Sequence, residues 1–339
     1  MKEFDRRKFI KSVTAAGVGM SIVGSPIMSV GKSLQKKTTV GVIGLDTSHS
    51  TAFTKAINDP DGGADVSDFE VIAAYPWGSR NIKASGERIP GYTEEMVKMG
   101  VEIVDSIDEL LTKVDVVLLE TNDGNPHLEQ ALPVMKAGKP MFIDKPITGS
   151  LKDAVAIIEA SKQYNTPIFS SSSLRYMESA QAVRNDNTIG EVLGADTFSP
   201  ASLEESHPDL FWYGIHGVEI LYTVMGAGCQ TVTRTHTEGT DVVVGTWDKD
   251  RIGTFRGIRN GRGGYGGTAY GSEDIATLGP YGGYRPLVVN ILEFFRTGIS
   301  PVDLDETLEI YAFMEAADES KRQGGLPVNI DDVLSKARA

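Results

Sequence analysis

The strongest constraint on the fold is an alternation of short apolar runs with helical stretches between residues 38 and 143. The apolar runs cover residues 38–44, 69–75, 114–120 and 140–143, and they are typical of buried parallel strands. Helical patterns occupy residues 49–58, 93–99, 107–111 and 127–137. This alternation predicts a doubly wound α/β domain with a parallel sheet, whose ligand binds at the carboxyl ends of the strands.

The second half of the chain has a different pattern. Short strands are predicted at residues 194–199, 231–238, 241–247 and 251–256, followed by helices at 286–297 and 305–323. We therefore expect an α+β domain with an open antiparallel sheet. The 339 residues suit about two domains. We place them at residues 37–172 (the doubly wound, Rossmann-type domain) and 173–339 (the α+β domain), after an N-terminal segment at 1–36.

The N-terminal segment reads Asp-Arg-Arg-Lys-Phe-Ile-Lys at residues 5–11, which resembles the bacterial twin-arginine export signal. The apolar stretch after it is too short and too weakly hydrophobic for a stable membrane span. We therefore predict export to the periplasm, or beyond it, through the twin-arginine machinery and without a membrane anchor. Because this route carries folded proteins, often with a cofactor aboard, the signal also favours a bound cofactor.

Charge and cysteine content exclude several classes. The formal net charge of −13 argues against a nucleic-acid-binding protein, which needs a basic face. The single cysteine, Cys229, excludes an internal disulfide framework and a thiolate metal cluster. No grouping of His, Asp and Glu has the spacing of a metal site, so none is predicted.

The turn after the first strand departs from the dinucleotide fingerprint Gly-x-Gly-x-x-Gly. The register gives Gly44, Asp46 and His49, so only the first glycine is present. A carboxylate about 4 Å from a phosphate costs about 4 kcal/mol at an intermediate dielectric. Either Asp46 turns away and caps the helix while the hydroxyls of Thr47 and Ser48 meet the phosphates, or the site takes no dinucleotide. His49 either contacts a phosphate or caps the helix.

The end of the second strand lacks the acid that normally holds the ribose hydroxyls. Ser79 and Arg80 follow this strand instead and could hold a 2′-phosphate, which slightly favours NADP over NAD. The alternative is that Arg80 is a solvated loop residue.

Three segments carry a family resemblance. Residues 121–127 read Thr-Asn-Asp-Gly-Asn-Pro-His, residues 137–140 read Ala-Gly-Lys-Pro, and residues 144–146 read Asp-Lys-Pro. In this order and spacing they resemble the Gfo/Idh/MocA oxidoreductase family. The resemblance implies a bound NAD or NADP. It places the following residues at the cofactor: Thr121, Asn122, His127, Asp144 and Lys145. Residues 171–176 resemble a further family segment, whose arginine, Arg175 here, is also expected at the cofactor.

A fourth segment, residues 212–222, resembles the part of the family that carries a proton-relay histidine. His216 matches that histidine, and Trp212 stands where the family has an aspartate. Glu219 could orient the imidazole, while Trp212 and Tyr213 could contact a sugar. Oxidation of a secondary alcohol needs a base for the hydroxyl proton while hydride passes to nicotinamide. The resemblance thus implies Lys145 and His216 as the catalytic pair.

A glycine-rich stretch at residues 256–271 holds seven glycines and three arginines. It is either a flexible surface loop or a loop that binds an acidic sugar through Arg256, Arg259 or Arg262.

Three functions remain open. The first is an exported NAD(P)-dependent oxidoreductase that acts on a sugar, cyclitol or related polyol and keeps its cofactor tightly bound. The second is a glycosidase that uses transient oxidation by bound NAD. The third is a non-catalytic carbohydrate-binding scaffold, indicated by Asp46, His49 and Trp212. The family resemblance also implies a homo-oligomer formed through the second sheet.

Overall fold

The computed structural model describes residues 36–339, so the twin-arginine motif and the apolar stretch after it lie outside the described residues. Among residues 36–339, no helix has both the length and the apolar character that crossing a membrane requires.

The first domain is built on a six-stranded sheet in the order β3-β2-β1-β4-β5-β6, with every pair parallel. The strands are β1 (Thr38–Ile43), β2 (Phe69–Tyr75), β3 (Glu102–Ile103), β4 (Val116–Leu119), β5 (Met141–Ile143) and β6 (Ile168–Ser170). The strand order reverses between β1 and β4, and a crevice opens at the carboxyl ends of such strands. The predicted doubly wound parallel sheet is confirmed.

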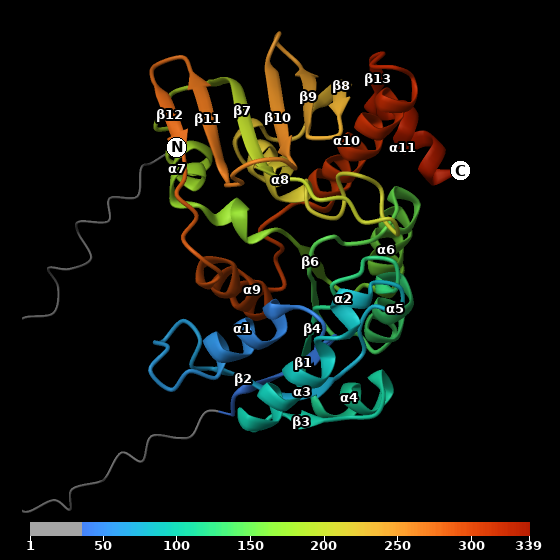
Figure 1. Cartoon of the computed structure of the whole chain (residues 1–339). Coiled ribbons are helices and arrows are strands. Elements are labelled where there is room, and N and C mark those ends of the chain that lie inside the picture. Colours follow the sequence, from blue (N-terminus) through green and yellow to red (C-terminus); the bar gives the residue numbers. More distant parts are fainter. Residues whose placement is uncertain (1–35) are drawn as a thin grey trace, which may run out of the picture. The chain divides into compact units, whose positions relative to one another are not determined.

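The helices of this domain lie on both sides of the sheet (Figure 1). They are α1 (Ser48–Ile57), α2 (Lys83–Gly86), α3 (Ile89–Lys98), α4 (Ile107–Lys113), α5 (His127–Lys136) and α6 (Leu151–Tyr164). Serine side chains cap α4 and α6, where Ser106 and Ser150 accept the backbone N–H groups of Glu109 and Asp153. These caps explain why α4 and α6 begin directly after Ser106 and Ser150.

The second domain has a seven-stranded sheet in the order β12-β11-β7-β10-β9-β8-β13. Its strands are β7 (Val192–Pro200), β8 (Cys229–Thr237), β9 (Thr240–Trp247), β10 (Ile252–Ile258), β11 (Gly266–Gly271), β12 (Ile275–Leu278) and β13 (Val328–Asn329). The expected sheet was antiparallel, but β7 and β10 run parallel, so the sheet is mixed. A helix and the β8–β9 hairpin separate these strands in sequence, which gives the chain room to return in the same direction.

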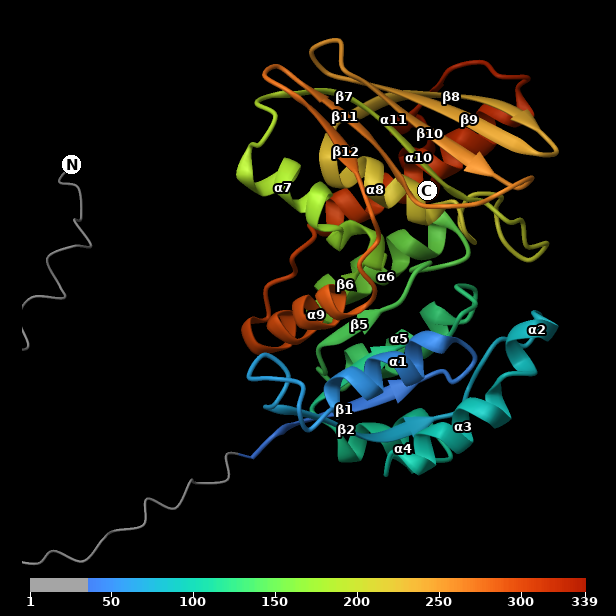
Figure 2. The same cartoon turned by 60° about the vertical axis from the view of Figure 1, so that its left-hand side comes forward.

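Helices cover one face of this sheet and lie between it and the first domain (Figure 2). They are η2 (Ser173–Tyr176), α7 (Glu178–Asp186), α8 (Ile215–Met225), α10 (Leu304–Arg322) and α11 (Ile330–Arg338). Every residue of α8 is buried, because the sheet packs on one side of it and neighbouring helices on the other. This position holds the start of α8 at the junction of the two domains.

The glycine-rich stretch is partly a strand rather than a loop. Residues of β11 pair with β7 and β12, and a Cβ atom added at Gly267 would lie 2.2 Å from the backbone oxygen of Asp196. Glycine is therefore required there by close packing of the strands, and not by flexibility.

Helix α9 (Arg285–Thr297) returns to the first domain although it follows the second sheet in sequence. Its residues Leu287, Val288 and Ile291 belong to the same buried cluster as the sheet residues Val40 and Val42. At its end, the guanidinium of Arg296 lies 2.7 Å from the carboxylate of Asp68. The core of the Rossmann sheet is thus completed by a late segment of the chain.

Candidate active site

A cavity of about 410 Å³ lies where the carboxyl ends of the Rossmann strands face the second domain. The first domain lines it with residues of the β1–α1 turn and of the segments after β4 and β5. The second domain lines it with the loop before α8, the first turn of α8 and several tyrosines. This is the place at which a doubly wound sheet binds its ligand.

The β1–α1 turn keeps its first glycine for a backbone reason. Gly44 has φ +95°, and a Cβ atom there would lie 2.4 Å from the backbone nitrogen of Thr121. A side chain at this position would be strained by both the conformation and the contact. Gly44 therefore allows β1 and the segment after β4 to approach closely at the base of the cavity.

Asp46 turns away from the cavity, which is the alternative from the sequence analysis that leaves room for a dinucleotide. Its carboxylate is fully buried and accepts the backbone N–H groups of Ser79 and Asn122, at 2.7 and 2.8 Å. Burial nevertheless raises the pKa of Asp46, because desolvation outweighs these hydrogen bonds. The expectation that Asp46 caps α1 is wrong, since the hydroxyl of Thr47 accepts the His49 N–H instead.

With Asp46 turned away, the turn presents Thr47, Ser48 and the N-terminus of α1 to the cavity. Hydroxyl groups and free helix N–H groups are suited to phosphate oxygens. The turn therefore fits a diphosphate despite its missing glycines.

The two residues after β2 that the sequence analysis considered for a 2′-phosphate, Ser79 and Arg80, contact other groups of the protein. The hydroxyl of Ser79 is buried and donates to Asp123 at 2.9 Å. The guanidinium of Arg80 lies 4.2 Å from the centre of the Trp77 ring and is exposed. Neither side chain lines the cavity. Ser79 differs from the expectation because its hydroxyl donates a hydrogen bond to Asp123, which is 44 residues away in sequence.

The two predicted catalytic residues line the same cavity. Lys145 follows β5 and forms a cis peptide bond with Pro146, while His216 occupies the first turn of α8. Burial lowers the pKa of His216 well below its usual value, and the nearby charge of Lys145 lowers it further. The imidazole is therefore neutral at neutral pH and able to accept a proton.

Ser172, which the sequence analysis missed, is the partner of this imidazole. Its hydroxyl oxygen lies 2.7 Å from Nδ1 of His216 and also accepts the backbone N–H of Leu174. Glu219 was expected in this role, but its carboxylate instead accepts bonds from Arg175 and from the hydroxyl of Ser171, at 2.5 and 2.9 Å. Ser172 lies three residues before Arg175, and nothing in the local sequence shows that it contacts His216.

Arg175 was expected at the cofactor, and the structure places it elsewhere. It is 2% exposed and pairs with Glu219 on α8 and Glu306 on α10, the latter at 2.8 Å. The two carboxylates attract the guanidinium into the interior, away from the cavity. Arg175 therefore ties η2 to α8 and α10.

His127 was also expected at the cofactor but is a structural residue. Its ring nitrogens lie 2.7 Å from the backbone oxygen of Thr121 and 3.1 Å from that of Ile147. These contacts hold together the backbone segments after β4 and β5.

Asn122 does line the cavity, with its amide donating to Ser85 at 2.8 Å. The buried hydroxyl of Thr121 has no hydrogen-bond partner among the described residues.

Asp144 lies behind the cavity wall rather than in it. One oxygen of its carboxylate is 2.7 Å from Nδ1 of His49, which lines the cavity. His49 thus neither caps α1 nor is free to contact a phosphate through this nitrogen.

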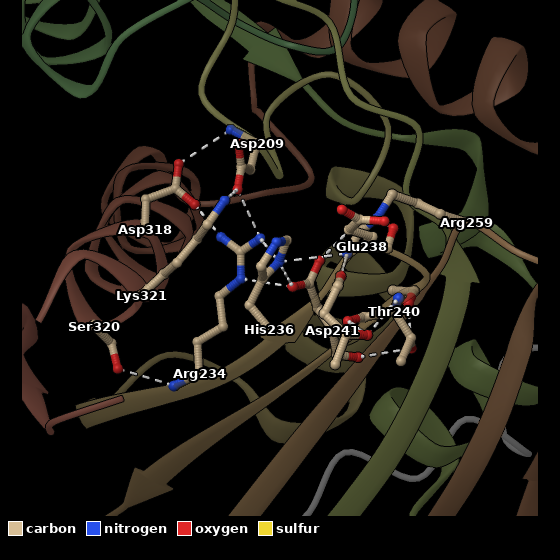
Figure 3. Close-up of polar contacts among 12 residues, drawn as sticks. Asp209, Arg234, His236, Glu238, Thr240, Asp241, Arg259, Asp318, Ser320 and Lys321 are labelled. Atoms are coloured by element: carbon tan, nitrogen blue, oxygen red, sulfur yellow. Dashed lines mark hydrogen bonds and ion pairs between the residues drawn. The ribbon is translucent and has the colours of Figure 1, made fainter. Parts of the chain in front are cut away.

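Two of the four predicted substrate residues, Trp212 and Tyr213, line the cavity. Their loop is anchored by Asp209, which accepts bonds from Arg234 and Lys321 at 2.8 and 2.7 Å (Figure 3). These cations come from β8 and α10, so the loop is tied to both elements.

Arg256 does not line the cavity. It points to the exposed face of the second sheet, because its neighbour Phe255 points to the buried face and side chains alternate along a strand.

Three tyrosines that the sequence analysis did not consider complete the cavity wall. Tyr265, Tyr281 and Tyr284 follow the glycine-rich stretch or lie within it. The hydroxyl of Tyr281 lies 2.9 Å from that of Ser173. Burial raises the pKa of Tyr281 to about 12, and the pKa values of the other two are raised as well. All three therefore stay protonated and can donate hydrogen bonds to a polyhydroxylated ligand.

Residues 38–171 match the sequence model of a family described as an oxidoreductase family with an NAD-binding Rossmann fold, Gfo/Idh/MocA. The first domain is therefore similar to the NAD-binding domain of the Gfo/Idh/MocA family. An uncharacterized oxidoreductase of Streptococcus pneumoniae is 27% identical over 155 residues, which are 41% of this chain and 42% of that protein. An inositol 2-dehydrogenase of Gluconacetobacter diazotrophicus is 30% identical over 96 residues, 27% of this chain and 28% of that protein. The chain thus matches less than half the length of these curated relatives.

Solved structures extend the likeness in fold to the second domain. A scyllo-inositol dehydrogenase from Lactobacillus casei, with bound NAD(H) and scyllo-inositol, has a TM-score of 0.70 at 13% identity, covering 87% of this chain and 100% of that one. A putative myo-inositol dehydrogenase from Sinorhizobium meliloti has a TM-score of 0.71 at 17% identity, with the same coverage. At these identities the likeness shows the fold.

Proposed function

We propose that this protein is an NAD-dependent oxidoreductase that acts on a secondary alcohol of a cyclitol, sugar or related polyol. One observation carries the proposal: Lys145 and a neutral His216 line one cavity at the carboxyl ends of a Gfo/Idh/MocA Rossmann sheet. Relatives named as inositol dehydrogenases support the class of substrate.

The residues around the cavity fit a dinucleotide. Thr47, Ser48 and the N-terminus of α1 would hold its diphosphate, and Asn122 and Lys145 its nicotinamide end. When bound, nicotinamide supplies the hydride acceptor.

We infer a preference for NAD over NADP, contrary to the sequence-based expectation. That expectation depended on Ser79 and Arg80, which the structure turns to other partners. The carboxylates of Asp46 and Asp123 both lie within hydrogen-bond distance of Ser79. These carboxylates would repel the additional phosphate of NADP.

In the oxidation, the ammonium of Lys145 donates a hydrogen bond to the reacting hydroxyl oxygen and orients it. The neutral imidazole of His216 accepts the hydroxyl proton while the carbon loses hydride, so that a ketone forms. Ser172 holds Nδ1 of His216, which leaves the other ring nitrogen for this transfer. Trp212 offers an aromatic face to the C–H groups of the substrate, and the tyrosines donate to its other hydroxyls.

The test has two stages. Protein purified from an export-competent host is denatured, and the released dinucleotide is identified by mass spectrometry. Turnover is then followed by the absorbance of reduced nicotinamide with a panel of inositols and sugars. Lys145→Ala and His216→Ala should each lower kcat by about 100-fold or more. The surface variant Lys98→Ala, whose side chain is 68% exposed, is the control.

The outcomes separate the three functions. Turnover that survives both catalytic substitutions would contradict the assigned roles. Cleavage of glycosides without net reduction of the bound dinucleotide would favour the glycosidase that uses transient oxidation. A protein that binds no dinucleotide would favour a carbohydrate-binding scaffold.

We also propose export through the twin-arginine machinery, supported by the paired arginines at residues 6 and 7. Fractionation of cells that express the wild type and an Arg6→Lys/Arg7→Lys variant tests it. The wild type should accumulate outside the cytoplasm and the variant inside it.

The exposed face of the second sheet supports a homo-oligomer. Phe198, Ile252, Tyr270 and Ile275 on this sheet are between 37% and 61% exposed. We propose that a second copy covers this apolar face. Light scattering of the wild type should give a multiple of the chain mass, and Ile252→Glu/Ile275→Glu should lower it.

A further inference from the structure

Three buried residues at or directly behind the cavity wall have no role in the proposed reaction. They are His49 on the first turn of α1, Glu120 directly after β4, and Asp144 directly after β5. One ligand atom of each residue lies within 4.8 Å of those of the other two. The sequence predicted no metal site because positions 49, 120 and 144 are too far apart to form a motif. The fold brings them together at neighbouring strand ends.

The carboxylate of Glu120 lacks any partner. Both of its oxygens, and Oδ1 of Asp144, are buried without a hydrogen bond to any of residues 36–339. Buried carboxylates are normally paired or coordinate a metal, because desolvation otherwise disfavours their charge. Burial raises the pKa of Glu120 well above its usual value, and the charge of Asp144 adds to this effect. The nearby charge of Lys145 offsets this only in part, and no group donates a hydrogen bond to the Glu120 carboxylate among the described residues.

The local charges indicate what kind of partner is missing. Two carboxylates face one ammonium, that of Lys145, and the imidazole of His49, which lies 2.7 Å from Asp144. A divalent cation would neutralise both carboxylates and would satisfy all three unpartnered oxygens. A water molecule would supply hydrogen bonds but no charge.

We propose that His49, Glu120 and Asp144 bind one divalent first-row transition-metal ion. An imidazole nitrogen with two carboxylate oxygens suits zinc, manganese, iron or cobalt, whereas magnesium and calcium prefer oxygen ligands alone. Donor atoms around such an ion are about 3 Å apart when adjacent and about 4 Å apart when opposite. The three ligand atoms lie close enough to reach this geometry with small side-chain movements.

The histidine is already oriented for this role. Its ring stacks on Phe53, with centroids 5.3 Å apart, and meets the edge of Tyr284 at 4.8 Å. These contacts direct Nδ1 towards Asp144. His49 also lines the cavity, so the cluster adjoins the cavity on that side.

The inference is independent of the proposed redox function, and the experiment separates the two. The full chain is treated with a chelator, equilibrated with Zn²⁺ or Mn²⁺, dialysed, and analysed for metal per chain by mass spectrometry. We expect one ion per chain for the wild type. Affinity should fall by at least 100-fold in His49→Gln and in Glu120→Gln. Glu129→Gln, which changes an exposed carboxylate on α5, is the control and should bind as the wild type does.

A second measurement excludes misfolding as the cause of lost binding. Glu120→Gln removes a buried charge, so its metal-free Tm should equal or exceed that of the wild type. Added Zn²⁺ should raise the Tm of the wild type and of Glu129→Gln but not that of Glu120→Gln. Co²⁺ should give the wild type visible absorption bands that both ligand variants lack.

Two results would overturn the inference: a wild-type chain that binds none of these ions, or binding that survives both ligand substitutions. Dinucleotide binding is measured in parallel on the metal-free protein. A chain that binds dinucleotide but no metal contradicts only the metal site. A chain that binds metal but no dinucleotide contradicts only the redox function.

Discussion

The hydroxyl oxygen of Ser172 and Nδ1 of His216 are 2.7 Å apart, and this contact joins the segment after β6 to the first turn of α8. It fixes the plane of the imidazole at the cavity wall. The acidic partner expected from the sequence, Glu219, is held by Arg175 instead. The histidine is therefore positioned by a neutral group, which leaves its pKa low.

Replacing this partner should affect catalysis more than binding. Ser172→Ala removes one hydrogen bond, worth about 0.5–1.5 kcal/mol, so kcat should fall by roughly 2- to 10-fold. The KM for the dinucleotide should stay unchanged. Steady-state kinetics measure both values, with the surface variant Ser67→Ala as the control. A rise in KM without a fall in kcat would show that Ser172 does not position the imidazole.

The pH dependence should follow the low pKa of His216, which burial and the charge of Lys145 hold well below 6.5. The imidazole is already neutral at pH 6.5, so kcat/KM for alcohol oxidation should be level from there to pH 7.5. Unfolding lets the imidazole bind a proton below pH 6.5, so stability should decrease as the pH falls from there towards the folded-state pKa. An acid limb centred above pH 6.5 would contradict this assignment.

Asp46→Gly should destabilise the protein without improving its affinity for a dinucleotide. The substitution leaves the buried N–H groups of Ser79 and Asn122 without an acceptor. The free energy of unfolding should fall by about 2–5 kcal/mol. Urea denaturation measures this fall, and NADH fluorescence measures affinity. A steep gain in affinity at unchanged stability would mean that the carboxylate obstructs the diphosphate.

Asp318 should make stability depend on pH in the direction opposite to that of His216, because its pKa is raised in the folded state and that of His216 is lowered. Burial raises its pKa to about 7 despite the contact with Arg234. The folded state binds the extra proton between the unfolded pKa of 3.8 and about 7, so stability should decrease as the pH rises through that window. The loss should amount to about 2–4 kcal/mol. Asp318→Asn should flatten the difference between urea unfolding at pH 5 and at pH 8; an unchanged difference would refute the assignment.

Features that depend on local sequence could be predicted. Apolar runs of strand length located the Rossmann sheet, since burial on both faces requires them. Gly44 could be identified as the first glycine of the fingerprint, because the turn after β1 requires a positive φ there. Lys145 and His216, which short family motifs indicated, line one cavity.

Features that depend on distant partners could not be predicted. Asp46 and Ser79 are 33 residues apart, and His49 and Asp144 are 95 apart, so no local pattern shows where these side chains turn. Arg175 sits at a family position, but Glu306 on α10 pulls it into the interior. The parallel pairing of β7 with β10 likewise follows from packing around α8 rather than from strand composition.

The return of α9 to the Rossmann sheet determines when the first domain can fold. Its core includes Leu287, Ile291 and Val302, so a nascent chain that has reached only residue 172 still exposes the apolar surface that these residues cover. The ribosome must synthesise nearly the whole chain before either half is finished. Folding is therefore a late, single event that follows synthesis, and residues 38–171 expressed alone should aggregate rather than fold.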